Sequence, residues 1–132
     1  MGKYRKLSEK MYSVLFIANS TGDLETVLMF LQIGVDPNNH SFYDWTPLHC
    51  ATWHNQPAVV RLLIGVGANP GAENSFGDTP LLLANLEIAN ILLIAGANPN
   101  IKNKYGKTPL DYIGSDGDKD IVRLLLDYGA GL

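Results

Sequence analysis

The sequence predicts an all-α solenoid, in which one helix–turn–helix unit is repeated along a chain of 132 residues. Three Thr-Pro-Leu triplets begin at Thr46, Thr79 and Thr108, with spacings of 33 and 29 residues. Four glycines follow the same spacing, namely Gly34, Gly67, Gly96 and Gly129. A unit of this length cannot bury its apolar face alone, so the copies must stack on one another. The stack presents a long surface, which favours recognition over chemistry.

Each triplet is predicted to begin a short first helix. Thr46 is a favoured N-cap residue, and Pro47 suits the first helical position because its fixed φ matches the helix and its missing N–H is not needed there. The same start recurs at Thr79 and Thr108. Counting back 33 residues from Thr46 leads to Ser13, which begins Ser-Val-Leu-Phe-Ile-Ala. An opening unit therefore lacks Thr-Pro but keeps the apolar pattern, as expected of an N-terminal cap.

The second helices share apolar residues at matching positions, which predicts a wide buried stripe. Each is expected to end at one of the four glycines, where the chain needs a positive φ. The segments that follow, around 35–45, 68–78 and 97–107, are rich in turn residues and are predicted to project from the stack. The apolar columns are Val59, Ile88 and Ile121; Val27, Val60, Ala89 and Val122; Met29, Leu62, Ile91 and Leu124; and Phe30, Leu63, Leu92 and Leu125.

Units three and four depart from this pattern. Unit three is 29 rather than 33 residues long, a difference of about one helical turn. We expect a shortened first helix, with Asn85 capping the second helix directly and a notch beside Trp53 and His54 of the preceding unit. The last unit replaces apolar residues with polar residues and glycine, which is typical of a C-terminal cap. We therefore expect either a complete chain or a domain of a longer protein.

The string Thr-Pro-Leu-His-Cys-Ala at residues 46–51, together with the period, resembles the ankyrin repeat. The resemblance covers roughly residues 7–132 and implies a single domain over 1–132, with repeats at about 9–41, 42–74, 75–103 and 104–132. It also implies that the projecting turns are β-hairpin fingers. Partner contacts are then expected from the finger tips and the exposed side of the first helices, which together form a concave face.

Composition limits the compartment and the class of partner. Cys50 is the single cysteine, which excludes an internal disulfide and favours a reducing compartment, the cytoplasm or the nucleus. No apolar run is long enough to span a membrane, so we expect no membrane partner. The net charge of −3 and the scattered basic residues argue against nucleic acid, because phosphate binding needs a coherent basic surface. We expect a monomer that binds another protein.

An enzyme is the main alternative class, and its best candidate pair is Cys50 and His54, four residues apart on one helix face. No orienting third group or oxyanion donors accompany this pair, so we predict no catalytic activity and no cofactor. The resemblance implies a structural hydrogen bond for His49 near the neighbouring turn. His40 and these residues lack zinc-finger spacing, so no metal site is predicted and stability should depend little on the three histidines.

The resemblance places the candidate partner-binding residues on the fingers and first helices, where aromatic side chains are the favoured hot spots. Phe42, Trp45 and Trp53 are expected to face solvent and contact the partner beside the notch, on repeats two and three. Aromatic residues at finger tips also pack on neighbouring fingers, so that alternative stays open for Tyr43, Phe76 and Tyr105. The full set is Phe42, Tyr43, Trp45, Trp53, His54, Phe76, Asp78, Lys104, Tyr105 and Lys107, with Lys10, Tyr12, Ser20, Ser75, Ser115 and Asp116 at corresponding positions.

Two functions fit such a surface. The first is an adaptor or scaffold that recognises a partner protein through the concave face. The second is an inhibitory or regulatory subunit that blocks a kinase or another enzyme by covering its surface.

Overall fold

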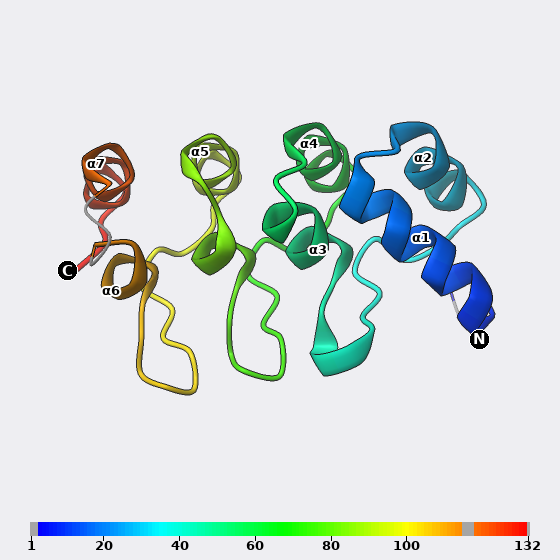
Figure 1. Cartoon of the computed structure of the whole chain (residues 1–132), viewed down its shortest axis with the longest axis horizontal. Helices are drawn as coiled ribbons and strands as arrows, with labels where there is room; N and C mark the ends of the chain where they lie inside the picture. The colour runs from blue at the N-terminus through cyan, green and yellow to red at the C-terminus, as the bar shows by residue number, and fades with distance from the viewer. Residues whose placement is uncertain (1–2, 115–117, 132) are drawn as a thin grey trace.

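The computed structural model describes residues 3–114 and 118–131, and over these residues the chain forms two layers of helices with loops below them (Figure 1). The first layer holds α1 (Glu9–Thr21), α3 (Pro47–Trp53), the 3₁₀ helix η2 (Pro80–Leu83) and α6 (Pro109–Gly114). The second layer holds α2 (Leu24–Gln32), α4 (Pro57–Gly65), α5 (Leu86–Ile94) and α7 (Lys119–Asp127). The predicted all-α solenoid is confirmed.

Capping side chains explain where most first helices begin. Thr46 Oγ1 accepts the His49 N–H at 3.3 Å, and Thr108 Oγ1 accepts the Asp111 N–H at 3.3 Å. Helix α1 begins four residues before Ser13, because Ser8 caps it by accepting the Met11 N–H at 3.3 Å. At Thr79 the short helix begins at Pro80 as predicted, but the Thr79 side chain makes no capping hydrogen bond to η2.

Repeat three has the shortened first helix that its length predicts. Helix η2 has four residues, whereas α3 has seven. Ala84 then extends the backbone, with φ −86° and ψ 143°, and Asn85 begins the second helix at once. Asn85 Oδ1 accepts the Ile88 N–H at 3.1 Å, which confirms the predicted cap.

The core lies between the two layers and is built from the predicted columns. Leu63, Leu92 and Leu125 are at most 1% exposed. Met29 is an exception to the prediction of a buried stripe, because its side chain is 49% exposed. It belongs to the first repeat, whose helix α2 lies at one end of the stack of described residues (Figure 1). The second helices end as predicted, with φ between 92° and 98° at the four spaced glycines.

Three loops hang below the first layer and correspond to the expected fingers, including the short 3₁₀ helix η1 (Phe42–Asp44) in the first (Figure 1). A backbone hydrogen bond closes the base of each loop, but none of the loops contains a regular strand in the part of the chain that is described. The closing N–H···O bonds join Ser41 to Trp45 at 2.8 Å, Asn74 to Asp78 at 3.1 Å, and Asn103 to Lys107 at 2.9 Å. Among the described helices, none is long and apolar enough to cross a membrane.

Candidate protein-binding surface

Backbone hydrogen bonds join the three fingers side by side. The Ser75 N–H donates to the Tyr43 carbonyl at 2.8 Å, and the Lys104 N–H donates to the Phe76 carbonyl at 2.9 Å. Each bond links one finger to the next at the same place in the repeat. The finger tips therefore form one connected edge of the molecule, which we call the finger ladder.

Two buried asparagines hold the second and third fingers in shape. Asn74 Oδ1 accepts the N–H groups of Phe76 and Asp78 at 2.9 and 3.0 Å. Asn103 Oδ1 makes the equivalent pair of bonds in the third finger, at 2.9 and 3.0 Å. Neither asparagine is among the residues predicted from the sequence. Their spacing in the sequence could have identified them. Each asparagine lies two residues before the aromatic residue of its finger, Phe76 or Tyr105, and five residues before the threonine of Thr-Pro.

His49 connects the first helix of repeat two to the following finger. Its side chain is fully buried, and Nδ1 accepts the Thr46 N–H at 3.2 Å. Because Nδ1 is an acceptor, Nε2 carries the proton and donates it to the Asp78 carbonyl at 2.7 Å. Burial lowers the pKa of His49, which keeps the ring neutral. The expectation that stability depends little on all three histidines therefore does not fit His49, which is a structural residue.

The finger aromatics combine stacking with exposure. Tyr43 and Phe76 stack, with ring centroids 5.7 Å apart and an interplanar angle of 30°, and this stacking reinforces the ladder. Phe42 is 89% exposed, and Tyr43 and Tyr105 are each 67% exposed, so these three side chains present most of their surface to solvent. Phe76 is less exposed, at 39%, so the packing alternative is better supported for Phe76 than for Tyr43.

The two tryptophans differ in their surroundings. Trp53 is 61% exposed, as expected of a contact residue. Trp45 is only half-exposed, because its ring packs against His49 at 5.7 Å and edge-on against Trp53 at 6.4 Å. The expectation that Trp45 faces solvent is therefore wrong. The Trp45 side chain is partly buried and packs against the ring of Trp53.

The remaining predicted residues are spread along the same surface. Asp78 is half-buried and accepts a hydrogen bond from Asn103 Nδ2 at 2.9 Å, so its carboxylate already joins two fingers. Lys104 and Lys107 are exposed on the third finger, and His54 is exposed at the end of α3. Ser115 and Asp116 lie outside the described residues.

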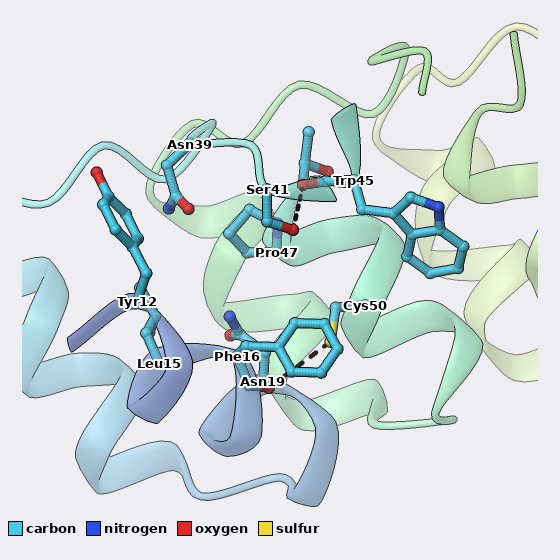
Figure 2. A pocket seen from close by; sticks show the side chains of 10 residues that line it. Tyr12, Leu15, Phe16, Asn19, Asn39, Ser41, Trp45, Pro47 and Cys50 are labelled. Carbon is cyan, nitrogen blue, oxygen red and sulfur yellow. Dashed lines mark hydrogen bonds between the residues drawn. The ribbon is translucent and has the colours of Figure 1, made fainter. Parts of the chain in front are cut away.

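A hollow borders Trp45 on the side of repeat one. It lies between α1 and the first finger, where Phe16 faces Ser41 and Trp45 (Figure 2). The aromatic pocket that the sequence predicts between repeats two and three, beside the short helix of repeat three, stays a prediction. The hollow described here is a different one, between α1 and the finger that follows it.

The geometry of Cys50 and His54 does not suit nucleophilic catalysis. The thiol lies 3.9 Å from His54 Nδ1, but Nδ1 is 3.0 Å from the Cys50 carbonyl. A carbonyl only accepts, so Nδ1 carries the proton and cannot act as the base for the thiol. Burial raises the pKa of Cys50, and the hydrogen bond with Ser20 offsets only part of this effect. The described residues contain no group of three or more metal-ligating side chains.

Comparison with known proteins relates the chain to repeat proteins of several organisms. It is 38% identical over 60 residues to protein phosphatase 1 regulatory subunit 27 of Homo sapiens, which is 46% of this chain and 39% of that protein. It is 41% identical over 56 residues to protein fem-1 homolog A of Homo sapiens, which is 42% of this chain and 8% of that protein. An ankyrin repeat-containing protein of Schizosaccharomyces pombe is 32% identical over 79 residues, 59% of this chain and 38% of its own length.

The matches span less than two fifths of the length of each of these relatives. The sequence profile of the family described as ankyrin repeats (3 copies) matches residues 3–74 and 66–132. The chain therefore belongs to the ankyrin-repeat family, whose repeats serve as protein-interaction modules.

Proposed function

We propose that this chain is an adaptor or scaffold module that binds a partner protein through the concave face and the finger ladder. The observation that carries the proposal is the exposure of large aromatic side chains there, with Phe42 at 89% and Trp53 at 61%. Aromatic residues of this kind dominate binding energy at protein interfaces. The backbone bonds between fingers support the same role, because a rigid surface loses little entropy on binding.

We propose that the protein has no catalytic activity, because the pKa of the Cys50 thiol is raised and His54 cannot serve as a base for that thiol. We propose a monomer without a cofactor, located in the cytoplasm or the nucleus, because its one cysteine suits a reducing compartment. A net charge of −3 supports a protein partner rather than nucleic acid.

The second candidate is a regulatory subunit that inhibits an enzyme by covering its surface. It is supported by the similarity to protein phosphatase 1 regulatory subunit 27, a regulatory subunit by name. The purified catalytic subunit of protein phosphatase 1 is therefore a direct probe. Tight binding together with a fall in its activity would favour this candidate, whereas binding without inhibition would favour the adaptor.

Affinity capture from cell lysate with quantitative mass spectrometry tests the main proposal. The bait is the whole chain, compared with Trp53→Ala and with Glu25→Lys on α2, an exposed site away from the fingers. We expect one set of proteins to be enriched by the wild type and by Glu25→Lys but lost from Trp53→Ala. The proposal fails if Trp53→Ala captures the same set while Glu25→Lys loses it.

A further inference from the structure

Two pairs of rings lie next to each other where α1 meets α3, and we call them the aromatic surface. Phe16 stands edge-on to His54, with ring centroids 6.4 Å apart and an interplanar angle of 86°. Trp45 stands edge-on to Trp53, at 6.4 Å and 90°. The two pairs are neighbours, because Phe16 and Trp45 border the same hollow (Figure 2). Phe16 is 44% exposed and Trp53 is 61% exposed, so each pair presents part of a ring to solvent.

Phe16 adds to this surface a residue that the sequence-predicted set does not contain. It lies 33 residues before His49 and so holds the same place in repeat one. His49 is fully buried and joins Thr46 to the carbonyl of Asp78. Phe16 has no polar atom for such a role, and 44% of its surface stays in contact with water. A partner that covers this ring would remove apolar surface from water, which favours binding.

The aromatic surface offers hydrogen-bond donors but contains no acidic side chain, lysine or arginine. The indole N–H groups of Trp45 and Trp53 make no hydrogen bond with any other residue that the structure describes. An indole N–H only donates, so its counterpart must be an acceptor. An occupant that matches this surface therefore combines apolar groups with free carbonyl oxygens.

A protein segment can bind to such a surface as a strand, as an α-helix or as a polyproline II helix. A strand binds by extending the edge of a sheet, but the described residues contain no strand. An α-helix uses its carbonyls in its own hydrogen bonds, so it has few to offer an indole N–H. A polyproline II helix makes no internal hydrogen bonds and leaves its carbonyls free. Its proline rings also supply the apolar groups, so it fits both requirements.

We infer that the aromatic surface binds a proline-rich segment of the partner protein in the polyproline II conformation. Proline rings pack on the exposed faces of Phe16 and Trp53, and a carbonyl of the segment accepts the Trp53 indole N–H. This mode uses only ring surface that is already exposed, and nothing needs to enter the hollow beside Trp45. The inference rests on the proposed function and names the chemistry of its partner.

Synthetic peptides test the surface without any knowledge of the partner. The whole chain is titrated with a peptide of about ten prolines, which forms a polyproline II helix, and with a flexible glycine–serine peptide of the same length. Both tryptophans of the chain belong to the aromatic surface, so tryptophan fluorescence and the indole N–H signals in NMR report directly on it. We expect the proline peptide to bind about ten-fold more tightly or better, and to shift the Trp53 indole signal.

Two substitutions of Trp53 separate its ring from its donor. Trp53→Ala should weaken binding of the proline peptide about ten-fold or more, whereas Trp53→Phe keeps a ring, loses the N–H and should weaken it only several-fold. Phe16→Ala should also weaken binding. Tyr128→Ala is the matched control, because Tyr128 is 42% exposed but lies in the last repeat, and its affinity should equal that of the wild type. Thermal melts check that each variant folds, and Trp53→Phe still tests the donor if an alanine variant does not.

The inference is overturned by equal affinities for the two peptides, or by wild-type affinity in both Trp53→Ala and Phe16→Ala. A loss in Tyr128→Ala as large as that in Trp53→Ala also overturns it, as does tighter binding of an alanine-rich helical peptide. These outcomes leave the proposed function intact if lysate capture still depends on Trp53. Conversely, proline binding together with lysate capture that does not depend on Trp53 would contradict only the proposed function.

Discussion

His49 shows how one buried side chain joins two repeats. Its Nδ1 satisfies the Thr46 N–H, and its Nε2–H satisfies the Asp78 carbonyl of the next finger. Removing the ring leaves both partners without their bonds. We predict that His49→Ala lowers the free energy of unfolding by about 2 kcal/mol or more, measured by urea denaturation at pH 7.5. His54→Ala, on an exposed residue at the C-terminal end of α3, should change it by less than about 1 kcal/mol.

The same residue should make stability depend on pH. Burial places the folded-state pKa of His49 below its ordinary value of 6.5. Above pH 6.5 the ring is neutral in both the folded and the unfolded chain. Below pH 6.5 the unfolded chain binds a proton at His49 that the folded chain does not bind. Stability is therefore lost as pH falls from 6.5 toward the folded-state pKa. We predict that the difference in free energy of unfolding between wild type and His49→Ala shrinks from pH 7.5 to pH 5.5, measured by urea denaturation at both pH values.

The two tryptophans should respond differently to truncation. Trp53 is 61% exposed, so Trp53→Ala should leave Tm almost unchanged and weaken partner binding about thirty-fold, the effect of one hot spot. Trp45 is half-buried against His49 and Trp53, so Trp45→Ala should lower Tm by several degrees as well as weakening binding. Thermal melts and titration with a captured partner check both. A large fall in Tm for Trp53→Ala would show that it is a packing residue.

At the level of single elements, the start of α5 depends on one side chain. In repeat three only the four-residue helix η2 and the extended residue Ala84 precede α5. Asn85, the next residue, is therefore the one that caps the start of α5. We predict that Asn85→Ala costs about 1 kcal/mol, the usual effect of losing an N-cap. Asn90→Ala, in the exposed middle of α5, should instead be neutral or slightly stabilising, because alanine is the better helix former. Urea unfolding of both variants makes the comparison.

The second helices should be sensitive to truncation only where a neighbouring repeat covers them. Leu63 is 1% exposed and Met29 is 49% exposed, although the sequence pattern predicts that both are buried. We predict a loss of about 2–5 kcal/mol for Leu63→Ala, from lost transfer energy and an unfilled cavity. Met29→Ala should cost less than about 1 kcal/mol. Equal losses, measured by chemical denaturation, would mean that Met29 is covered in solution.

At the scale of the whole molecule, the finger ladder depends on close approach between neighbouring repeats. Gly77 and Gly106 occupy the same finger position, with φ of 75° and 74°. A Cβ atom at Gly77 would lie 3.0 Å from the Lys104 backbone nitrogen, whereas one at Gly106 would meet nothing within 4 Å. Both alanine variants carry the strain of a positive φ, of about 1 kcal/mol. We predict a larger loss of Tm for Gly77→Ala, together with faster hydrogen exchange at the Lys104 amide.

The local features of this fold could be predicted from the sequence by itself. The 33- and 29-residue periods indicated stacked helical pairs, the spaced glycines marked where second helices end, and the missing turn in repeat three predicted both its short helix and the Asn85 cap. The helix caps and helix ends depend on residues within about one helical turn in the sequence. A few consecutive residue types are therefore enough to predict an N-cap or a glycine with a positive φ.

Only the tertiary structure decided which side chains are free to bind. The pattern did not distinguish Phe42, at 89% exposure, from the half-buried Trp45, and it did not show the neutral ring of His49. Trp45 is partly covered by His49 and Trp53 of its own repeat, and His49 bonds to the Asp78 carbonyl, which the stacking of the next repeat brings close. The early start of α1 and the path of the first finger, rather than the motif, determine where the hollow lies. The physical reason is that exposure is a property of packing, which a local sequence pattern does not contain.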